Sequence, residues 1–276
     1  MDRPAVITSK SNRLIVRIGS LAEKKYRDSE RLFRFDGIKL FREAAACGIA
    51  LRCVLVSADA AGADAMLSEA GSKAPEAALY LLSGEVFAKL SPEKSPEGII
   101  SVAEFPSSLH IRADGGDEAA QALSGVPGIL ALESVRDPGN LGTVIRSAAA
   151  FGTEALLLSG DCADIYNPRV LRAAMGAVFS RGIVITADLP SALRRLAAAG
   201  RRILGTTLSS DAVPLQDAGV RNSDIFVIGN EGHGLSGAVI AACDRKVFIP
   251  MERGPGIESL NAAVAASVIM YERKRC

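Results

Sequence analysis

The second half of the chain alternates short, nearly continuous apolar stretches with longer stretches that carry apolar residues at helical spacing. Strands without polar alternation are typical of parallel sheets buried on both faces, because each crossover connection lays a helix over the sheet. The pattern predicts an α/β domain in which ligands bind beyond the carboxyl ends of the strands. The expected strands are residues 129–133, 155–159, 183–186, 202–206, 225–228 and 246–249, and the expected helices are 141–150, 169–178, 191–199, 237–242 and 259–274.

The first half predicts a smaller α/β domain. A segment rich in Pro, Ser, Gly and acidic residues without a clear period follows it, and we expect a linker there with a short helix near residues 117–123. The domain boundaries are therefore predicted at 1–106, a linker at 107–126, and 127–276. In the first domain the expected strands are 31–35, 51–57, 79–82 and 99–103, and the expected helices are 37–47, 60–70 and 84–90.

Charge and composition narrow the function classes. The net charge is +1, but nine Lys/Arg face three Asp/Glu between Arg3 and Arg34. That basic end suits nucleic-acid phosphates, and a solvated helix face fits equally well. Two histidines and five cysteines without a CxxC pair argue against a metal site, a Ser–His–acid triad and disulfides. With no signal-like apolar run and no stretch of about 18–20 apolar residues, no membrane association and a cytoplasmic location are expected.

Residues 137–152, DPGNLGTVIRSAAAFG, form the first loop that could carry chemistry. Residues 137–139 are expected to be a turn, with Asn140 in the loop and Arg146 one turn into a helix that ends at Gly152. A helix N-terminus with a nearby arginine suits a phosphate. A well-capped surface helix is an equally good interpretation of the local chemistry.

Residues 226–236, FVIGNEGHGLS, place three glycines after a buried strand. Such a loop needs unusual dihedral angles or a close backbone approach, and its spacing is neither the dinucleotide fingerprint nor a P-loop. Glu231 could anchor an arginine or a ligand hydroxyl, or could be an exposed turn carboxylate. His233 is better explained as a surface residue than as a base.

The third loop follows the strand at 246–249 and contains Gly and Pro at residues 254–256. Ser259 is the predicted N-cap of the last helix, and a purely structural cap with Asn261 bonding locally is the alternative. Apolar residues recur at helical spacing from there: Leu260, Val264, Val268 and Tyr271.

Together the three loops resemble the motifs of the SpoU/TrmH branch of the SPOUT superfamily, the AdoMet-dependent RNA 2′-O-ribose methyltransferases. The motifs are PGNxGxxxRxAxAFG at residues 138–152, GxExxG at 229–234, and IPM with a later ESLNxxxA at 249–265. The first half is similar to the substrate-binding domain of the rRNA-directed members, through segments such as RLFRFDGIKLFREA, in which Asp36-Gly37 replaces the usual Glu-Gly.

The resemblance implies a small N-terminal α/β substrate-binding domain and a C-terminal SPOUT domain with a mainly parallel sheet, flanking helices and a deep trefoil knot. It implies S-adenosyl-L-methionine as cofactor, S-adenosyl-L-homocysteine as product, no metal, and a homodimer with RNA across the subunit interface. By motif position the cofactor contacts are Thr206, Gly229, Ile249, Met251 and Leu260.

The resemblance also assigns catalytic roles. Arg146 matches the arginine that activates the ribose 2′-hydroxyl; because a guanidinium has a pKa above about 12, we expect it to hold a phosphate first and to accept a proton second. Asn140 would support Arg146, and Glu231 would organise the site through Arg146. Ser259 and Asn261 would orient the substrate and the cofactor pocket.

One departure lies beside the cofactor site. Met251 and Glu258 enclose six residues, ERGPGI, which is more than is usual in the family, so the backbone contacts there are the least transferable.

The predicted function is methyl transfer to a ribose 2′-hydroxyl of 23S rRNA. A tRNA 2′-O-methyltransferase and a non-catalytic RNA-binding ribosome assembly factor are the alternatives. The N-terminal domain argues against the first alternative, and the complete polar set argues against the second.

Overall fold

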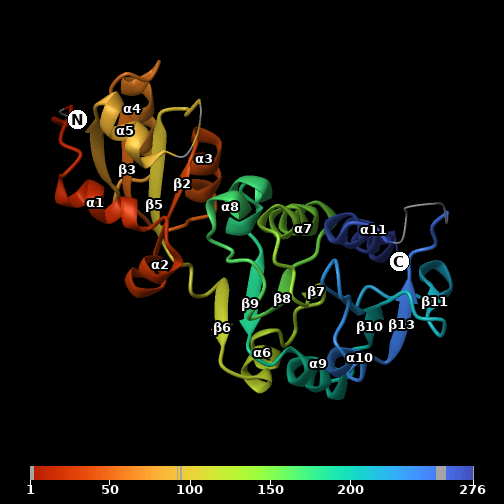
Figure 1. Ribbon diagram of the computed structural model, residues 1–276. Coiled ribbons are helices and arrows are strands. Elements are labelled where there is room, and N and C mark those ends of the chain that lie inside the picture. Colours follow the sequence, from red (N-terminus) through yellow and green to blue (C-terminus); the bar gives the residue numbers. More distant parts are fainter. Residues whose placement is uncertain (1–2, 92, 94, 253–258, 276) are drawn as a thin grey trace. The chain divides into compact units, whose positions relative to one another are not determined.

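The computed structural model describes residues 3–91, 93, 95–252 and 259–275. It contains two compact units, one made of Met1–Pro106 with Tyr166–Phe179 and the other of Ser107–Ile165 with Ser180–Cys276 (Figure 1). Among the described helices, none combines the length and the apolar character that spanning a membrane requires.

The first unit is built on a mixed five-stranded sheet in the order β1-β4-β3-β5-β2. β3 runs parallel to β4, and β5 runs antiparallel to both β2 and β3. Apolar residues of α1 and α5, among them Ile15 and Phe87, pack on the β3–β5 face around Leu55 and Ile100. The elements are β1 Val6–Ile7, α1 Arg13–Ser20, α2 Lys24–Glu30, β2 Leu32–Asp36, α3 Ile38–Ala46, β3 Leu51–Ser57, α4 Ala63–Lys73, β4 Ala78–Leu82, α5 Gly84–Leu90 and β5 Ile99–Glu104, with α8 Pro168–Ala174 and the 3-10 turn η1 Ala177–Phe179 added from later in the chain.

An aromatic cluster joins Tyr166–Phe179 to the first unit. Tyr166 stacks on Phe105 at 4.0 Å between ring centroids, and lies 4.5 Å from Phe33. Phe179 lies 5.1 Å from Phe35. All five rings are buried. The core of this unit is therefore completed by a segment about sixty residues beyond Pro106, a segment that the sequence assigned to the second domain.

The second unit contains an eight-stranded sheet in the order β11-β13-β10-β12-β7-β8-β9-β6, in which every described pairing is parallel. Within this unit α7 and α11 lie on one face of the sheet, and α6, α9 and α10 lie on the other (Figure 1). Its elements are β6 His110–Ala113, α6 Gly116–Ala122, β7 Ile129–Leu132, α7 Pro138–Phe151, β8 Ala155–Ser159, β9 Gly182–Thr186, α9 Leu189–Ala198, β10 Ile203–Thr206, β11 Val213–Pro214, the 3-10 turn η2 Leu215–Asp217, β12 Ile225–Ile228, α10 Gly237–Ile240, β13 Arg245–Phe248 and α11 Ala262–Arg275.

The predicted α/β architecture is confirmed, and every expected strand is present within one or two residues of its predicted ends. In the segment expected to be a linker, the predicted short helix is present as α6, but the segment also carries the edge strand β6, paired parallel with β9, which was not expected. A four-residue edge strand has too few residues to produce a readable period. The strand order and the packing of α11 on α7 are consistent with the trefoil knot, which stays a prediction.

Candidate functional site

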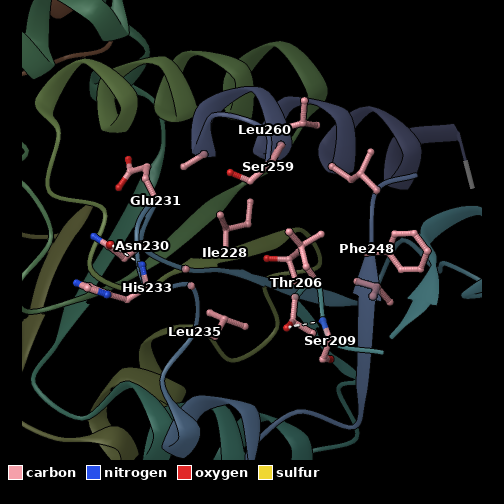
Figure 2. Close-up of a pocket in the computed structure, with 18 of the residues that line it drawn as sticks. Thr206, Ser209, Ile228, Asn230, Glu231, His233, Leu235, Phe248, Ser259 and Leu260 are labelled. Atoms are coloured by element: carbon pink, nitrogen blue, oxygen red, sulfur yellow. Dashed lines mark hydrogen bonds between the residues drawn. The ribbon is translucent and has the colours of Figure 1, made fainter. Parts of the chain in front are cut away.

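A pocket of about 630 Å³ lies at the carboxyl ends of β10, β12 and β13 in the second unit. Figure 2 shows Ser259 and Leu260 on the α11 side of this cavity and Leu235 across from them. Its size falls in the range of small-molecule sites, and the carboxyl edge is where parallel sheets bind ligands. It is lined by Thr206, Thr207, Leu208, Ser209, Ile228, Gly229, Asn230, Glu231, Gly232, His233, Gly234, Leu235, Ile240, Val247, Phe248, Ile249, Met251, Ser259, Leu260, Ala262 and Ala265.

The glycine loop after β12 folds back on itself. Asn230 and Gly234 exchange two backbone hydrogen bonds (3.1 and 2.9 Å), and the Asn230 side-chain oxygen accepts from the backbone N–H groups of Gly232 and His233. A Cβ atom on Gly229 would overlap the Gly234 carbonyl. Glycine is therefore required at 229 for a close backbone approach, and the loop presents main-chain groups to the pocket.

The helix of the first motif begins earlier than the sequence indicated. Asp137 is the N-cap, its carboxylate accepting from the Asn140 N–H at 2.8 Å, and Pro138 is the first helical residue. Asp followed by Pro is a favoured helix start. Asn140 consequently lies in the first turn of α7, not in a loop, and Arg146 lies in the third turn.

The last helix also begins at a different residue. The Asn261 side-chain oxygen accepts from the backbone N–H groups of Ala263 (2.9 Å) and Val264 (3.3 Å), so Asn261 is the N-cap of α11. Ser259 was expected to be the cap, and instead lines the pocket. Asparagine and serine are comparable caps, and here the asparagine is the residue placed to cap.

A chain of amide hydrogen bonds connects the three motifs. The Asn261 amide donates to the Asn140 side-chain oxygen at 2.9 Å, and the Asn140 amide donates to Glu231 Oε1 at 2.7 Å. Since Asn261 also caps α11, the glycine loop, the start of α7 and the start of α11 are fixed to one another. We call this set the Glu231–Asn140–Asn261 chain.

Arg146 lies outside this chain. Its side chain is exposed, and within the described residues it makes no hydrogen bond or ion pair. The expected link between Glu231 and Arg146 is absent, because Glu231 is bonded to Asn140 instead. The guanidinium of Arg146 is therefore available to an external anion.

All five predicted cofactor residues line the pocket: Thr206, Gly229, Ile249, Met251 and Leu260. The Thr206 hydroxyl donates to the Val227 carbonyl at 2.9 Å, which leaves its oxygen to accept from a ligand. Their roles as cofactor ligands stay predictions, as do the catalytic roles.

The pocket also contains residues that the motifs did not identify. Thr207, Leu208 and Ser209 form one rim, and Leu235 and Phe248 supply apolar wall. The usable signal was the predicted strand at 202–206, because the loop that follows each parallel strand reaches the carboxyl edge, where ligands bind.

The charge of the pocket favours a cation. Glu231 is its acidic residue, and the described lining contains no Lys or Arg. Among the residues that the structure describes, no three His, Cys, Asp or Glu side chains gather where they could hold a metal ion. The six-residue stretch between Met251 and Glu258, two residues longer than is usual in the family, falls largely on residues 253–258, outside the described part of the chain.

Comparison with protein families gives two matches. The family described as the SpoU rRNA Methylase family matches residues 127–271, and the family described as the MRM3-like substrate binding domain matches residues 12–101. The first match contains the whole pocket described above.

Individual relatives span most of the chain. An uncharacterized tRNA/rRNA methyltransferase from Synechocystis sp. is 31% identical over 98% of this chain and 94% of its own length. The Bacillus subtilis 23S rRNA (guanosine(2553)-2'-O)-methyltransferase RlmP is 33% identical over 70% of this chain and 71% of its own. The crystal structure of an AdoMet-bound rRNA methyltransferase from Sinorhizobium meliloti matches with a TM-score of 0.82 and 26% identity, covering 98% of this chain and 97% of the other.

Proposed function

Because the chain belongs to the SpoU rRNA methylase family, we propose that it transfers the methyl group of AdoMet to a ribose 2′-hydroxyl of 23S rRNA. It is an RNA methyltransferase. The observation that carries the finer proposal is the Glu231–Asn140–Asn261 chain, which unites residues from all three motifs beside one pocket.

The pocket fits AdoMet by size and by charge. A cavity of about 630 Å³ accommodates a nucleoside with an amino-acid tail. AdoMet supplies an electrophilic methyl group on a positively charged sulfonium. A lining with one carboxylate, main-chain carbonyls and no described basic side chain suits that charge, whereas a phosphate-bearing nucleotide would need cations or free N–H groups.

Arg146 is proposed to bind an RNA phosphate next to the target ribose. Its guanidinium, exposed and without a partner in the part of the chain that the structure describes, offers a planar fork of donors that matches phosphate oxygens. Because a 2′-hydroxyl is a weak nucleophile at neutral pH, fixing it in line with the methyl group is the main task, and effective concentration alone contributes strongly to such steps. Accepting the proton is its secondary role.

The remaining polar residues hold this arrangement. Asn140 is held through both ends of its amide, which fixes the N-terminal turn of the helix that carries Arg146. Ser259, exposed on the pocket wall, is proposed to contact the ribose, and Asn261 to keep α11 and Leu260 in register with the glycine loop.

The first unit is proposed to bind RNA, with residues 1–106 as the substrate-binding domain and 127–276 as the catalytic domain. The basic segment between Arg3 and Arg34 lies in this unit, and the family match over 12–101 supports the assignment.

A homodimer is proposed through α11. Three of the apolar residues predicted at helical spacing are exposed on α11, Val264 at 49%, Val268 at 37% and Tyr271 at 55%, whereas the buried side of the helix is formed by other residues, such as Ala266 and Ile269. An apolar stripe of this kind in water is typical of a surface covered by another chain, and light scattering of the purified protein should give twice the mass of the chain.

The central experiment is methyl transfer from radiolabelled AdoMet to RNA. Purified protein should label a 23S rRNA transcript, and digestion should recover the label as a 2′-O-methylated nucleoside. Label in tRNA alone would support the tRNA alternative, and RNA binding without AdoMet binding would support a non-catalytic assembly factor.

A further inference from the structure

A second polar network lies behind the glycine loop, at the carboxyl ends of β7 and β8. Its centre is Ser134, a non-glycine residue with φ of 55°. Residues other than glycine rarely adopt this left-handed backbone conformation, because their Cβ atom crowds the following carbonyl. Such a residue keeps its conformation only when its surroundings hold it there.

Hydrogen bonds hold Ser134 from the neighbouring strand. Its backbone N–H donates to Ser159 Oγ at 2.8 Å, and its hydroxyl donates to Asp161 Oδ2 at 2.7 Å. Ser159 in turn donates to Asp161 Oδ1 at 2.6 Å, and Arg136 donates to Oδ2 at 2.7 Å. Asp161 therefore accepts three donors, and both serines are oriented by it.

The ionised form of Asp161 is the one this geometry requires. Burial alone would raise the pKa of the Asp161 carboxyl group. The hydrogen bonds from Ser159, Arg136 and Ser134 outweigh the effect of burial, so the pKa of Asp161 is lowered to about 2. All three partners donate, which a carboxylate satisfies and a carboxylic acid satisfies only in part.

Ser134 transmits this constraint to the pocket. Its carbonyl accepts from the Asn230 amide at 2.9 Å, and Asn230 is the residue whose side-chain oxygen shapes the glycine loop. The preceding residue holds the other end of that loop, since Glu133 Oε2 accepts from the Ser236 N–H at 2.8 Å. Two adjacent residues after β7 thus fix both ends of residues 230–236, a wall of the pocket.

We propose that Asp161 is a positioning residue for AdoMet, acting through Ser134 and Asn230 on the glycine loop. The proposal rests on the proposed function only in taking AdoMet as the ligand of the pocket. Asp161 does not line the pocket, so its effect on the ligand is transmitted and not direct.

A purely structural role for Asp161 makes a different prediction. If the carboxylate only stabilises the loops, its loss lowers the melting temperature and leaves the affinity for AdoMet unchanged. If the Asp161 carboxylate positions the glycine loop, its loss lowers the affinity for AdoMet, and a second substitution that removes the backbone strain at residue 134 restores that affinity.

The test is a double-mutant cycle on the full-length protein, with AdoMet affinity measured by calorimetry. Asp161→Ala should raise the Kd for AdoMet about tenfold, which corresponds to about 1.4 kcal/mol. Glycine adopts the left-handed conformation without strain, so Asp161→Ala in a Ser134→Gly background should raise the Kd less than about threefold. Steady-state kinetics should place the loss of Asp161→Ala in the KM for AdoMet, with the KM for RNA unchanged.

Asp117→Ala is the matched control, because it removes an exposed carboxylate paired with Arg195 in the same unit, away from the pocket. Its AdoMet affinity should equal that of the unaltered protein. Asp161→Asn, which keeps one acceptor oxygen and the side-chain volume, should show an intermediate loss and serves if the alanine variant does not fold.

The outcomes separate the two proposals. Failure of the unaltered protein to bind AdoMet overturns the proposed function. If the unaltered protein and Asp161→Ala bind AdoMet with equal affinity, the positioning role alone is overturned. It is also overturned if Asp161→Ala loses as much affinity in the Ser134→Gly background as in the unaltered protein, because Asp161 would then act by a route that does not pass through residue 134.

Discussion

The two edges of the second sheet use polar residues in opposite ways. At the amino edge, Asp224, Arg202 and Arg273 direct their charges into the fold, and at the carboxyl edge, Asn140, Glu231 and Asn261 are only partly covered. Arg273 is 3% exposed and donates to the Ile129 carbonyl at 2.6 Å and to the Thr153 hydroxyl.

At the amino edge, charged side chains bond to groups of the same unit. Asp224 is fully buried, pairs with Arg202 and accepts from the Arg221 N–H at 2.8 Å. Arg201 donates to three backbone carbonyls, those of Val126, Pro127 and Ser223. These donors close the loops before β7, β10 and β12. Burial lowers the pKa of both Arg201 and Arg273, which stay cations because an arginine begins from so high a value.

At the carboxyl edge the main chain of the glycine loop faces a cavity, and within the described residues the Arg146 guanidinium of α7 has no partner. The comparison shows that the role of an arginine in this unit is indicated by the partners of its guanidinium and not by its presence alone. Arg273, buried and donating to the Ile129 carbonyl and the Thr153 hydroxyl, is structural, and Arg146, exposed and unpaired among the described residues, is suited to function. The predictions below test that division.

The largest effect is expected at the carboxyl edge. Arg146→Ala should lower kcat by about a thousandfold, equivalent to about 4 kcal/mol, because the phosphate of the substrate loses its clamp. The melting temperature should be unchanged, since no described residue depends on this side chain. Single-turnover methyl transfer and thermal unfolding measure the two quantities, and near-normal turnover by this variant would refute the proposed mechanism.

At the amino edge we expect a loss of stability with little loss of activity. Arg273→Leu removes donors from a buried carbonyl and a buried hydroxyl, which should lower the free energy of unfolding by about 2–4 kcal/mol. Methyl transfer measured well below the melting temperature should be nearly normal. Chemical denaturation gives the first value, and an equally stable but inactive protein would contradict the division between the edges.

A smaller effect is expected for the Glu231–Asn140–Asn261 chain. Asn140→Ala breaks both of its side-chain hydrogen bonds, and we expect about a tenfold to thirtyfold loss of kcat/KM, in line with about 1–2 kcal/mol for two lost hydrogen bonds. Thr143→Ala, on the same helix with its hydroxyl bonded, among the described residues, to the Gly139 carbonyl alone, is the control and should retain activity.

The smallest effect is a pH dependence at Asp161. Its pKa is depressed in the folded state, to about 2 from an ordinary value of 3.8, so the stability it contributes is present above the unfolded value and is lost as the pH falls through the folded value. The difference in unfolding free energy between the unaltered protein and Asp161→Asn should be constant above pH 5 and should shrink from about pH 4 to about pH 2. A difference that changes between pH 6 and 8 would show that another group is responsible.

The sequence predicted the architecture because buried parallel strands are continuous apolar runs, and it predicted the pocket because three motif loops follow strands of one sheet. It misplaced the two helix starts beside the pocket, since Asp137-Pro138-Gly139 is equally typical of a turn and both Ser259 and Asn261 are acceptable caps. It predicted the apolar stripe of α11, but a period of hydrophobic residues does not distinguish a core from a surface that awaits a partner chain.

The remaining features are set by distances between residues that are far apart in the sequence. No local pattern connects Asp161 to Ser134, whose hydrogen bond depends on the register of β7 against β8. The left-handed conformation of Ser134 is likewise invisible, because serine is not a residue that normally marks it. The buried partners of Arg273 lie more than a hundred residues away.

The aromatic cluster of the first unit has a consequence for the order in which the protein is made. Phe33, Phe35 and Phe105 leave the ribosome long before Tyr166 and Phe179, with which they pack. At about 5–20 residues per second, they wait for several seconds without those partners. The amino-terminal unit therefore cannot finish folding on the nascent chain until residues 107–165 of the methyltransferase unit have been synthesised, and a fragment that ends at Pro106 would lack part of its interior.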